Sequence, residues 1–220
     1  MPTSRTRFDA SSHGGTDETS TFVSELARVF REQVQRAVGM ELDGTSTSLA
    51  VVDHYLGLAR GEDRPEILSL LAAGAGAYFS QVVSSEIGAH VLDDRKDPRR
   101  IRVLLEPRCC HFSPVDLAYA AIVADDLSPD DPRHPPGRPL DLAFHLRTDA
   151  DDGPSDAAWI EARLAELPPV PADTFHTLTC RFETLELICE LLAARDAAAG
   201  RSPAPLAIED YARMLAGDGR

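Results

Sequence analysis

The amino-acid sequence predicts an α+β fold in which helices pack on a small, mostly antiparallel sheet and the C-terminal half is helical. Apolar residues recur at helical spacing over residues 22–37 and 67–88, change to a period of two between residues 90 and 112, and return to helical spacing after residue 155. The chain has 220 residues, of which 43% are hydrophobic. It is therefore long enough to bury a full core.

A long central helix is predicted to begin at Pro65, because proline is tolerated in the first turn of a helix, and to reach Gly88. Large side chains occupy one side of this helix and small ones the other. The internal glycines Gly74 and Gly76 each cost roughly 1 kcal/mol relative to alanine, so another segment should approach the backbone closely there. We interpret the segment as a core helix packed on both sides; a glycine pair that faces a ligand is the alternative.

Residues 1–20 are polar and predict a disordered tail, followed by a single α+β domain over residues 21–220. Within this domain, helical spacing predicts a first helix over residues 22–37. A second helix is expected to contain residues 49–56 and to end at Gly61.

Strands are predicted next, over residues 90–92, 101–106 and 109–112, the first two as a hairpin. Proline at the first helical position then predicts a helix over residues 115–124. Alternating apolar residues over 140–146 predict one more strand.

Helices are expected throughout residues 155–220, which form a possible helical subregion. Ser155 is expected to cap the first of them. Asp173 is expected to cap a long helix that stops at Gly200, and a final short helix is predicted over residues 208–215.

The segment over residues 76–82, Gly-Ala-Tyr-Phe-Ser-Gln-Val, and the turn over residues 87–90 resemble the Gly-Ala-Tyr-Leu-Gly-Glu-Val helix and Gly-Gly-x-Trp turn of a bacterial domain family of unknown function. Residues 42–53 are similar to the family's opening Leu-Asp-x-Ser-x-x-Ser-Leu element. The resemblance covers about residues 42–125. Ser80-Gln81 replaces the family's Gly-Glu pair, so no carboxylate is carried over. The resemblance implies a fold and no reaction.

The chain carries 22 basic and 36 acidic side chains, a net charge of −14. This sign disfavours nucleic acid and anionic membranes as partners, and it fits either a basic protein partner or simple solubility. The polar first twenty residues hold no secretory apolar segment, and uninterrupted apolar runs fall short of the roughly 18 residues that span a bilayer. We therefore expect a cytoplasmic protein with reduced cysteines.

Metal-capable residues occur in two places. His176 and Cys180 are four residues apart in a predicted helix, and Cys109 and Cys110 precede His111. A zinc site from His111, His176 and Cys180 is one interpretation, and a cysteine nucleophile beside His111 is another. Against both, adjacent residues of a strand point to opposite faces, and cysteine commonly serves as a small buried hydrophobe.

The sequence contains no nucleophile-elbow, phosphate-loop or dinucleotide-binding motif. We therefore expect a non-catalytic cytoplasmic protein that binds another protein, as an accessory factor or as a neutralising partner of a basic protein. The acidic, proline-rich segment 125–139 is expected to be a long exposed loop that contacts this partner. No catalytic residue and no cofactor are predicted. The alternative is a metal- or thiol-dependent enzyme or sensor.

Overall fold

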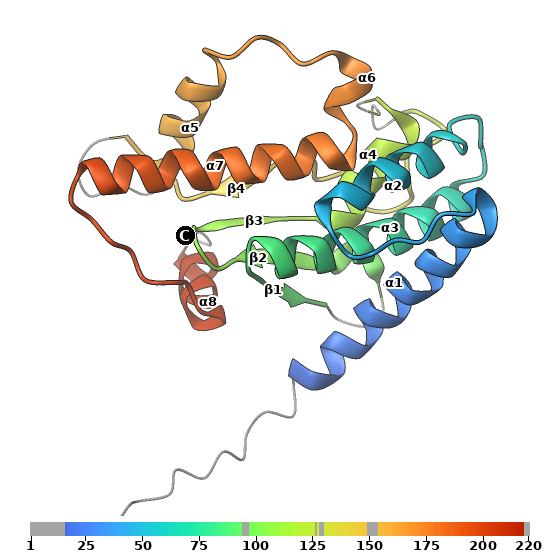
Figure 1. The fold of residues 1–220 in the computed structure, drawn as a ribbon, viewed down its shortest axis with the longest axis horizontal. Helices are drawn as coiled ribbons and strands as arrows, with labels where there is room; N and C mark the ends of the chain where they lie inside the picture. Colours follow the sequence, from blue (N-terminus) through green and yellow to red (C-terminus); the bar gives the residue numbers. More distant parts are fainter. Residues whose placement is uncertain (1–15, 94–96, 126, 128–129, 149–153, 218–220) are drawn as a thin grey trace, which may run out of the picture.

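The computed structural model describes residues 16–93, 97–125, 127, 130–148 and 154–217, and it has the predicted α+β fold (Figure 1). Its helices are α1 (Thr16–Val38), α2 (Leu49–Gly57), α3 (Pro65–Glu86), α4 (Pro114–Val123), α5 (Asp156–Leu164), α6 (Ala172–Phe175), α7 (Leu178–Ala198) and α8 (Ile208–Gly217). Its strands are β1 (Ala89–Leu92), β2 (Arg102–Leu105), β3 (Cys110–Phe112) and β4 (His145–Leu146).

Helix α3 runs through the middle of the molecule and packs against both α1 and α4 (Figure 1). A Cβ atom added to Gly74 would lie 2.9 Å from the side chain of Phe30 on α1. One added to Gly76 would lie 2.7 Å from the Cα of Val115 on α4. The two glycines therefore allow helices to approach on two sides, which confirms the interpretation of a core helix.

By length and composition alone, α3 is apolar enough to cross a membrane, as the only such helix in the described part of the chain. Its most apolar window is 67% buried inside the protein. Burial of this extent is what a core helix shows, so the composition of α3 is weak support for a membrane span.

The four strands form an antiparallel sheet in the order β1-β2-β3-β4. The predicted hairpin is present, with Val91 paired to Val103. Strand β4 is shorter than the strand predicted over residues 140–146. The N–H of Asp141 donates instead to the carboxylate of Asp116, at 3.0 Å, so the alternating apolar residues there reflect packing on the core.

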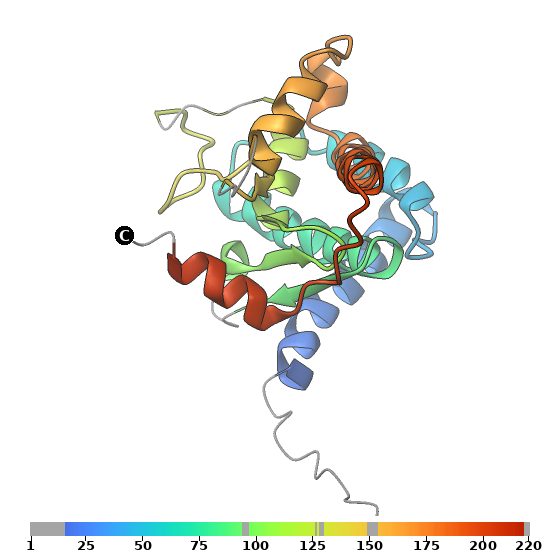
Figure 2. The same cartoon turned by 90° about the vertical axis from the view of Figure 1, so that its left-hand side faces the viewer.

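Both faces of β2 are covered. Val103 and Leu105 belong to the main core, whereas Leu104 packs on the opposite face with Cys109 and with Tyr211 of α8. The final helix, which lies at the sheet and away from α7 in Figures 1 and 2, thus closes a second, smaller core.

Several element boundaries differ from the prediction. Helix α2 ends at Gly57 and not at Gly61. Helix α1 begins at Thr16, inside the segment 1–20 that was expected to be a tail, and residues 1–15 lie outside the described part. Asp173 does not cap the long helix: it belongs to the short α6, and α7 begins after Thr177, whose hydroxyl accepts a hydrogen bond from the N–H of Cys180 at 3.1 Å.

The described part of the segment 125–139 is held against the body of the protein. Asp116 on α4 is fully buried, and its carboxylate forms ion pairs with Nε of Arg99 at 2.9 Å and with Nη1 of Arg138 at 2.8 Å. Arg99 also donates to the carbonyl oxygens of Pro136, Arg138 and Pro139. The described part of the segment is a loop, as predicted, and only part of it is exposed, because a buried ion-pair cluster attaches it to α4.

Candidate functional site

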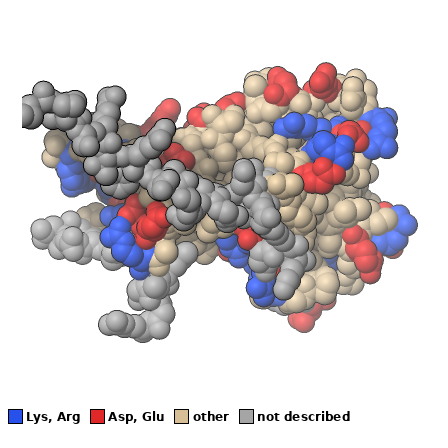
Figure 3. All heavy atoms as spheres, turned by 90° about the horizontal axis from the view of Figure 1, so that it is seen from below, with Lys and Arg blue, Asp and Glu red and all other residues tan. Residues whose placement is uncertain are grey.

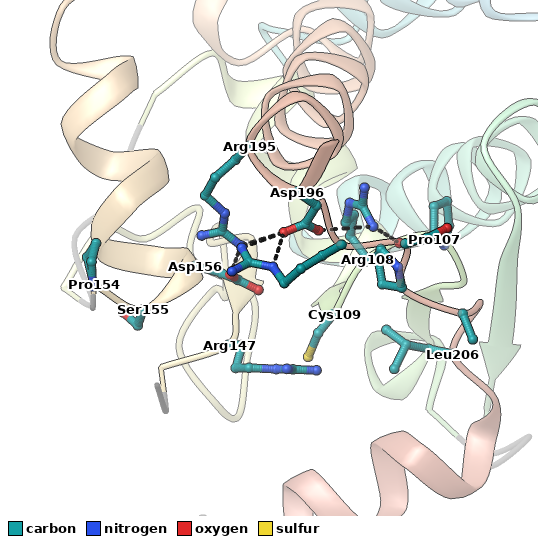
Figure 4. Close-up of a pocket in the computed structure, with 14 residues that line it drawn as sticks. Pro107, Arg108, Cys109, Arg147, Pro154, Ser155, Asp156, Arg195, Asp196 and Leu206 are labelled. Carbon is teal, nitrogen blue, oxygen red and sulfur yellow. Dashed lines mark hydrogen bonds and ion pairs between the residues drawn. The ribbon is translucent and has the colours of Figure 1, made fainter. Parts of the chain in front are cut away.

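Charge is unevenly placed on this acidic protein. Figure 3 shows a face on which basic and acidic side chains form small mixed groups instead of one continuous acidic surface. One mixed group of charged side chains lines a cavity where the β2–β3 turn, the start of α5, the end of α7 and the segment before α8 meet (Figure 4). This cavity, the arginine pocket, has a volume of about 650 Å³ and is lined by Arg108, Arg147, Arg195 and Arg201 and by Asp156 and Asp196.

Local structure explains why these residues converge. Arg108 lies in the turn between β2 and β3, and Asp156 is the first residue of α5, behind the Ser155 hydroxyl that caps this helix. At the end of α7, Gly200 has a φ of +67°, which glycine adopts readily. The chain turns back there, and the N–H of Arg201 donates to the carbonyl of Asp196 at 2.8 Å.

Asp196 is the centre of the charge cluster. Its side chain is 11% exposed, and Nη2 of Arg201 lies 2.8 Å from Oδ1. Nη1 of Arg108 lies 3.6 Å from Oδ2, and Nη2 of Arg195 lies 3.7 Å from Oδ1 (Figure 4). Arg195 also forms a close ion pair with Asp156. Two aspartates thus hold Arg108, Arg195 and Arg201 in position.

Two buried nitrogens of the pocket arginines, the Nε atoms of Arg108 and Arg195, have no hydrogen-bond partner among the described residues. Buried donors in proteins are nearly always satisfied, and guanidinium groups bind carboxylate and phosphate oxygens through paired N–H groups. The indole ring of Trp159 further fixes Arg195, whose guanidinium carbon lies 5.3 Å from the ring centroid. The pocket is therefore lined by guanidinium groups, the side chains that best match the oxygens of an anion.

The remaining wall is less polar. Pro107, Pro154, Pro203, Ala204 and Leu206 line it together with Cys109. A ligand that fills the cavity can thus place an anionic group on the arginines and an apolar part on the prolines, which is the usual combination in small-molecule sites.

Two of the buried or half-buried thiols, those of Cys110 and Cys189, are poor nucleophiles at neutral pH. Burial raises the pKa of Cys110 well above its ordinary value and raises the pKa of Cys189 to about 11. A thiol is reactive as the thiolate, so both remain protonated around pH 7.

The metal candidates from the sequence lie at different elements. His111 is on β3, where its ring stacks on that of His145 at a centroid distance of 4.8 Å. His176 follows α6, whereas Cys180 is in the first turn of α7 and burial raises its pKa. The prediction that His176 and Cys180 share one face of a single helix is wrong. Helix α6 ends at Phe175 and α7 begins only after Thr177, so the two residues do not belong to one helix. The described residues contain no group of three or more His, Cys, Asp or Glu side chains that could hold a metal ion.

Sequence reasoning missed the arginine pocket. Arg108 and Arg201 are far apart in the chain, and no local pattern relates them. The signal present in the sequence was their position beside element ends, Arg108 in a predicted hairpin region and Arg201 directly after the predicted stop at Gly200.

Comparison of the chain with models of known protein families, with curated proteins and with solved structures finds no match. The resemblance to the bacterial domain family over residues 42–125 stays a prediction. The arginine pocket is accordingly the feature from which a function is argued.

Proposed function

We propose that this chain is a binding protein that takes an anionic group, a phosphate or a carboxylate, into the arginine pocket. The observation that supports this proposal is the convergence of four arginines on one cavity. An anion there would accept hydrogen bonds from guanidinium groups, and two aspartates keep three of these groups oriented before it arrives.

The expected affinity is modest. A hydrogen bond to a charged group contributes roughly 1.5–3 kcal/mol, and association itself costs several kcal/mol. A small oxyanion held by two or three such bonds should therefore bind with a Kd of roughly 0.1 mM or weaker. A larger ligand that also covers the proline-lined wall should bind more tightly, because it buries apolar surface.

Two sequence-based hypotheses remain beside this proposal. The chain as a cytoplasmic protein that binds another protein, with a basic partner suggested by the net charge of −14, stays a prediction. The metal- or thiol-dependent alternative, through His111, His176 and Cys180, also stays a prediction.

Isothermal titration with inorganic phosphate and with citrate tests the proposal. Arg201→Gln and Arg147→Gln each remove one positive charge from an exposed position of the pocket and should weaken binding about three- to tenfold. Arg36→Gln removes the same charge from α1, where the side chain is 72% exposed and pairs with Glu32, and serves as the matched control. Equal affinity in all four proteins, or no binding of either anion by the natural chain, would contradict the proposal.

A further inference from the structure

One wall of the arginine pocket belongs to the last part of the chain. Residues 201–213, here called the C-terminal segment, contribute Arg201, Pro203 and Leu206 to the pocket and then form most of α8. The segment leaves α7 at Gly200 and crosses to the sheet (Figures 1 and 2).

The segment is attached at only a few places. Residues 201–205 are exposed, so little of this stretch is buried against the protein. Arg201 pairs with Asp196, and the N–H of Leu206 donates to the carbonyl of Glu106 at 2.8 Å. Few buried contacts and exposed backbone are the properties of regions that open without global unfolding.

Tyr211 forms the strongest of these attachments. Its side chain is 1% exposed, and its hydroxyl lies 2.7 Å from the carbonyl oxygen of Leu105 and 2.9 Å from that of Cys110. The carbonyl oxygen of Arg108 is 3.0 Å away, and the N–H of Cys110 donates to the hydroxyl at 2.9 Å. The hydroxyl of Tyr211 thus contacts backbone atoms of three residues at the β2–β3 turn, Leu105, Arg108 and Cys110.

The same turn carries Arg108. Tyr211 therefore acts on the pocket in two ways: it keeps the C-terminal segment in place, and it fixes the backbone from which Arg108 reaches Asp196. We call the pocket closed when the C-terminal segment lies against it, and open when the segment has moved away. A ligand that contacts both the segment and Arg108 binds the closed pocket better than the open one, so it shifts the protein toward the closed arrangement.

We infer that the C-terminal segment is a movable wall of the arginine pocket, that Tyr211 is the positioning residue that holds it closed, and that anion binding and closure stabilise each other. This inference rests on the proposed function. It adds that the affinity for an anion depends on a hydroxyl group that does not line the pocket.

Hydrogen exchange followed by mass spectrometry, with and without inorganic phosphate, tests the inference together with calorimetry. Phosphate should slow the exchange of backbone amides in residues 201–213 of the natural chain. Tyr211→Phe removes the hydroxyl, and should speed this exchange about tenfold and weaken phosphate binding several-fold, with exchange in α3 unchanged. Tyr55→Phe removes a hydroxyl from α2, distant in sequence from the segment and absent from the pocket lining, and is the matched control.

A second variant tests the inference even if Tyr211→Phe does not fold. Leu206→Ala shortens an apolar side chain that packs beside Tyr211 and leaves the hydroxyl contacts in place, so it should act in the same direction with a smaller effect. Phosphate binding that leaves the exchange of residues 201–213 unchanged, with Tyr211→Phe binding as tightly as the natural chain, would overturn the inference and leave anion binding intact. Faster exchange in Tyr211→Phe with no binding of phosphate or citrate by either protein would overturn the proposed function, and the linkage with it.

Discussion

Asp53 on α2 and Thr179 on α7, which are 126 residues apart, are joined by two hydrogen bonds: the carboxylate accepts from the N–H of Thr179 at 3.0 Å and from its hydroxyl at 2.6 Å. The same carboxylate accepts from the N–H of Leu178 at 2.7 Å. The first turn of α7 is thus capped by a side chain from a distant helix, and this contact ties the helical C-terminal half to the rest of the domain.

Replacement of this cap should lower stability. We expect Asp53→Ala to reduce the free energy of unfolding by about 2 kcal/mol at pH 7, because it leaves two backbone donors of α7 without an acceptor. Urea unfolding followed by circular dichroism measures the change. Thr177→Ala, which removes the local cap of the same helix, should cost about 1 kcal/mol, and a larger loss for Thr177→Ala would contradict the ranking.

The same carboxyl should make stability depend on pH. Burial is the largest influence and raises the pKa of Asp53 above its value in the unfolded chain, although the Thr179 and Leu178 hydrogen bonds oppose it. A raised pKa favours the protonated group in the folded state, so its contribution is present below about pH 3.9 and falls as the pH rises through the folded pKa. The stability difference between the natural chain and Asp53→Asn should therefore shift in favour of Asp53→Asn from pH 3.5 to pH 7. A difference that does not change with pH would exclude this shift.

The close approach at Gly76 should not tolerate a methyl group. The added Cβ of Gly76→Ala would lie 2.7 Å from the Cα of Val115, so α4 would have to move, and we expect a loss of about 3 kcal/mol in the free energy of unfolding. Gly57→Ala, at the end of α2, is the control, because nothing lies within 4 Å of its added Cβ. Thermal unfolding of both variants measures the loss of stability. Similar melting temperatures would show that α4 can move away from the added methyl group without a large cost.

The buried carboxylate of Asp116 should be essential for attachment of the segment 125–139. Asp116→Asn removes the charge that Arg99 and Arg138 share, and breaking a buried ion pair costs about 3–5 kcal/mol. We expect a lower urea midpoint and faster proteolysis within residues 130–139. Arg163→Gln, which breaks an exposed ion pair with Glu166, should leave both unchanged.

Cys189 should react slowly with alkylating reagents. With a pKa of about 11, roughly one molecule in three thousand carries the thiolate at pH 7.5. Labelling by iodoacetamide, followed by mass spectrometry of the peptide that contains Cys189, should speed up steadily between pH 7.5 and pH 9.5. Rapid and complete labelling at pH 7.5 would mean that the thiol is not buried as the structure places it.

Much of the fold could be predicted because its signals are local. The proline before α3, the apolar spacing of α1 and the alternation in β2 each reflect a property of a few neighbouring residues, and the predicted elements are present. Prediction failed where a distant group decides the outcome. The carboxylate of Asp116 accepts the N–H of Asp141, which therefore does not extend β4, and α8 covers Leu104 on the face of β2 opposite the main core.

Hydrophobic period and backbone preference act within one element, and they were enough to predict the α+β class, the core role of α3 with its two glycines, and the placement of most helices. The tertiary structure was needed to show where α7 begins, that both faces of β2 are covered, and that Arg108, Arg195 and Arg201 meet at Asp196. Hydrogen bonds and ion pairs form between groups that packing brings together. The spacing of residues along the chain does not show which distant groups will be in contact.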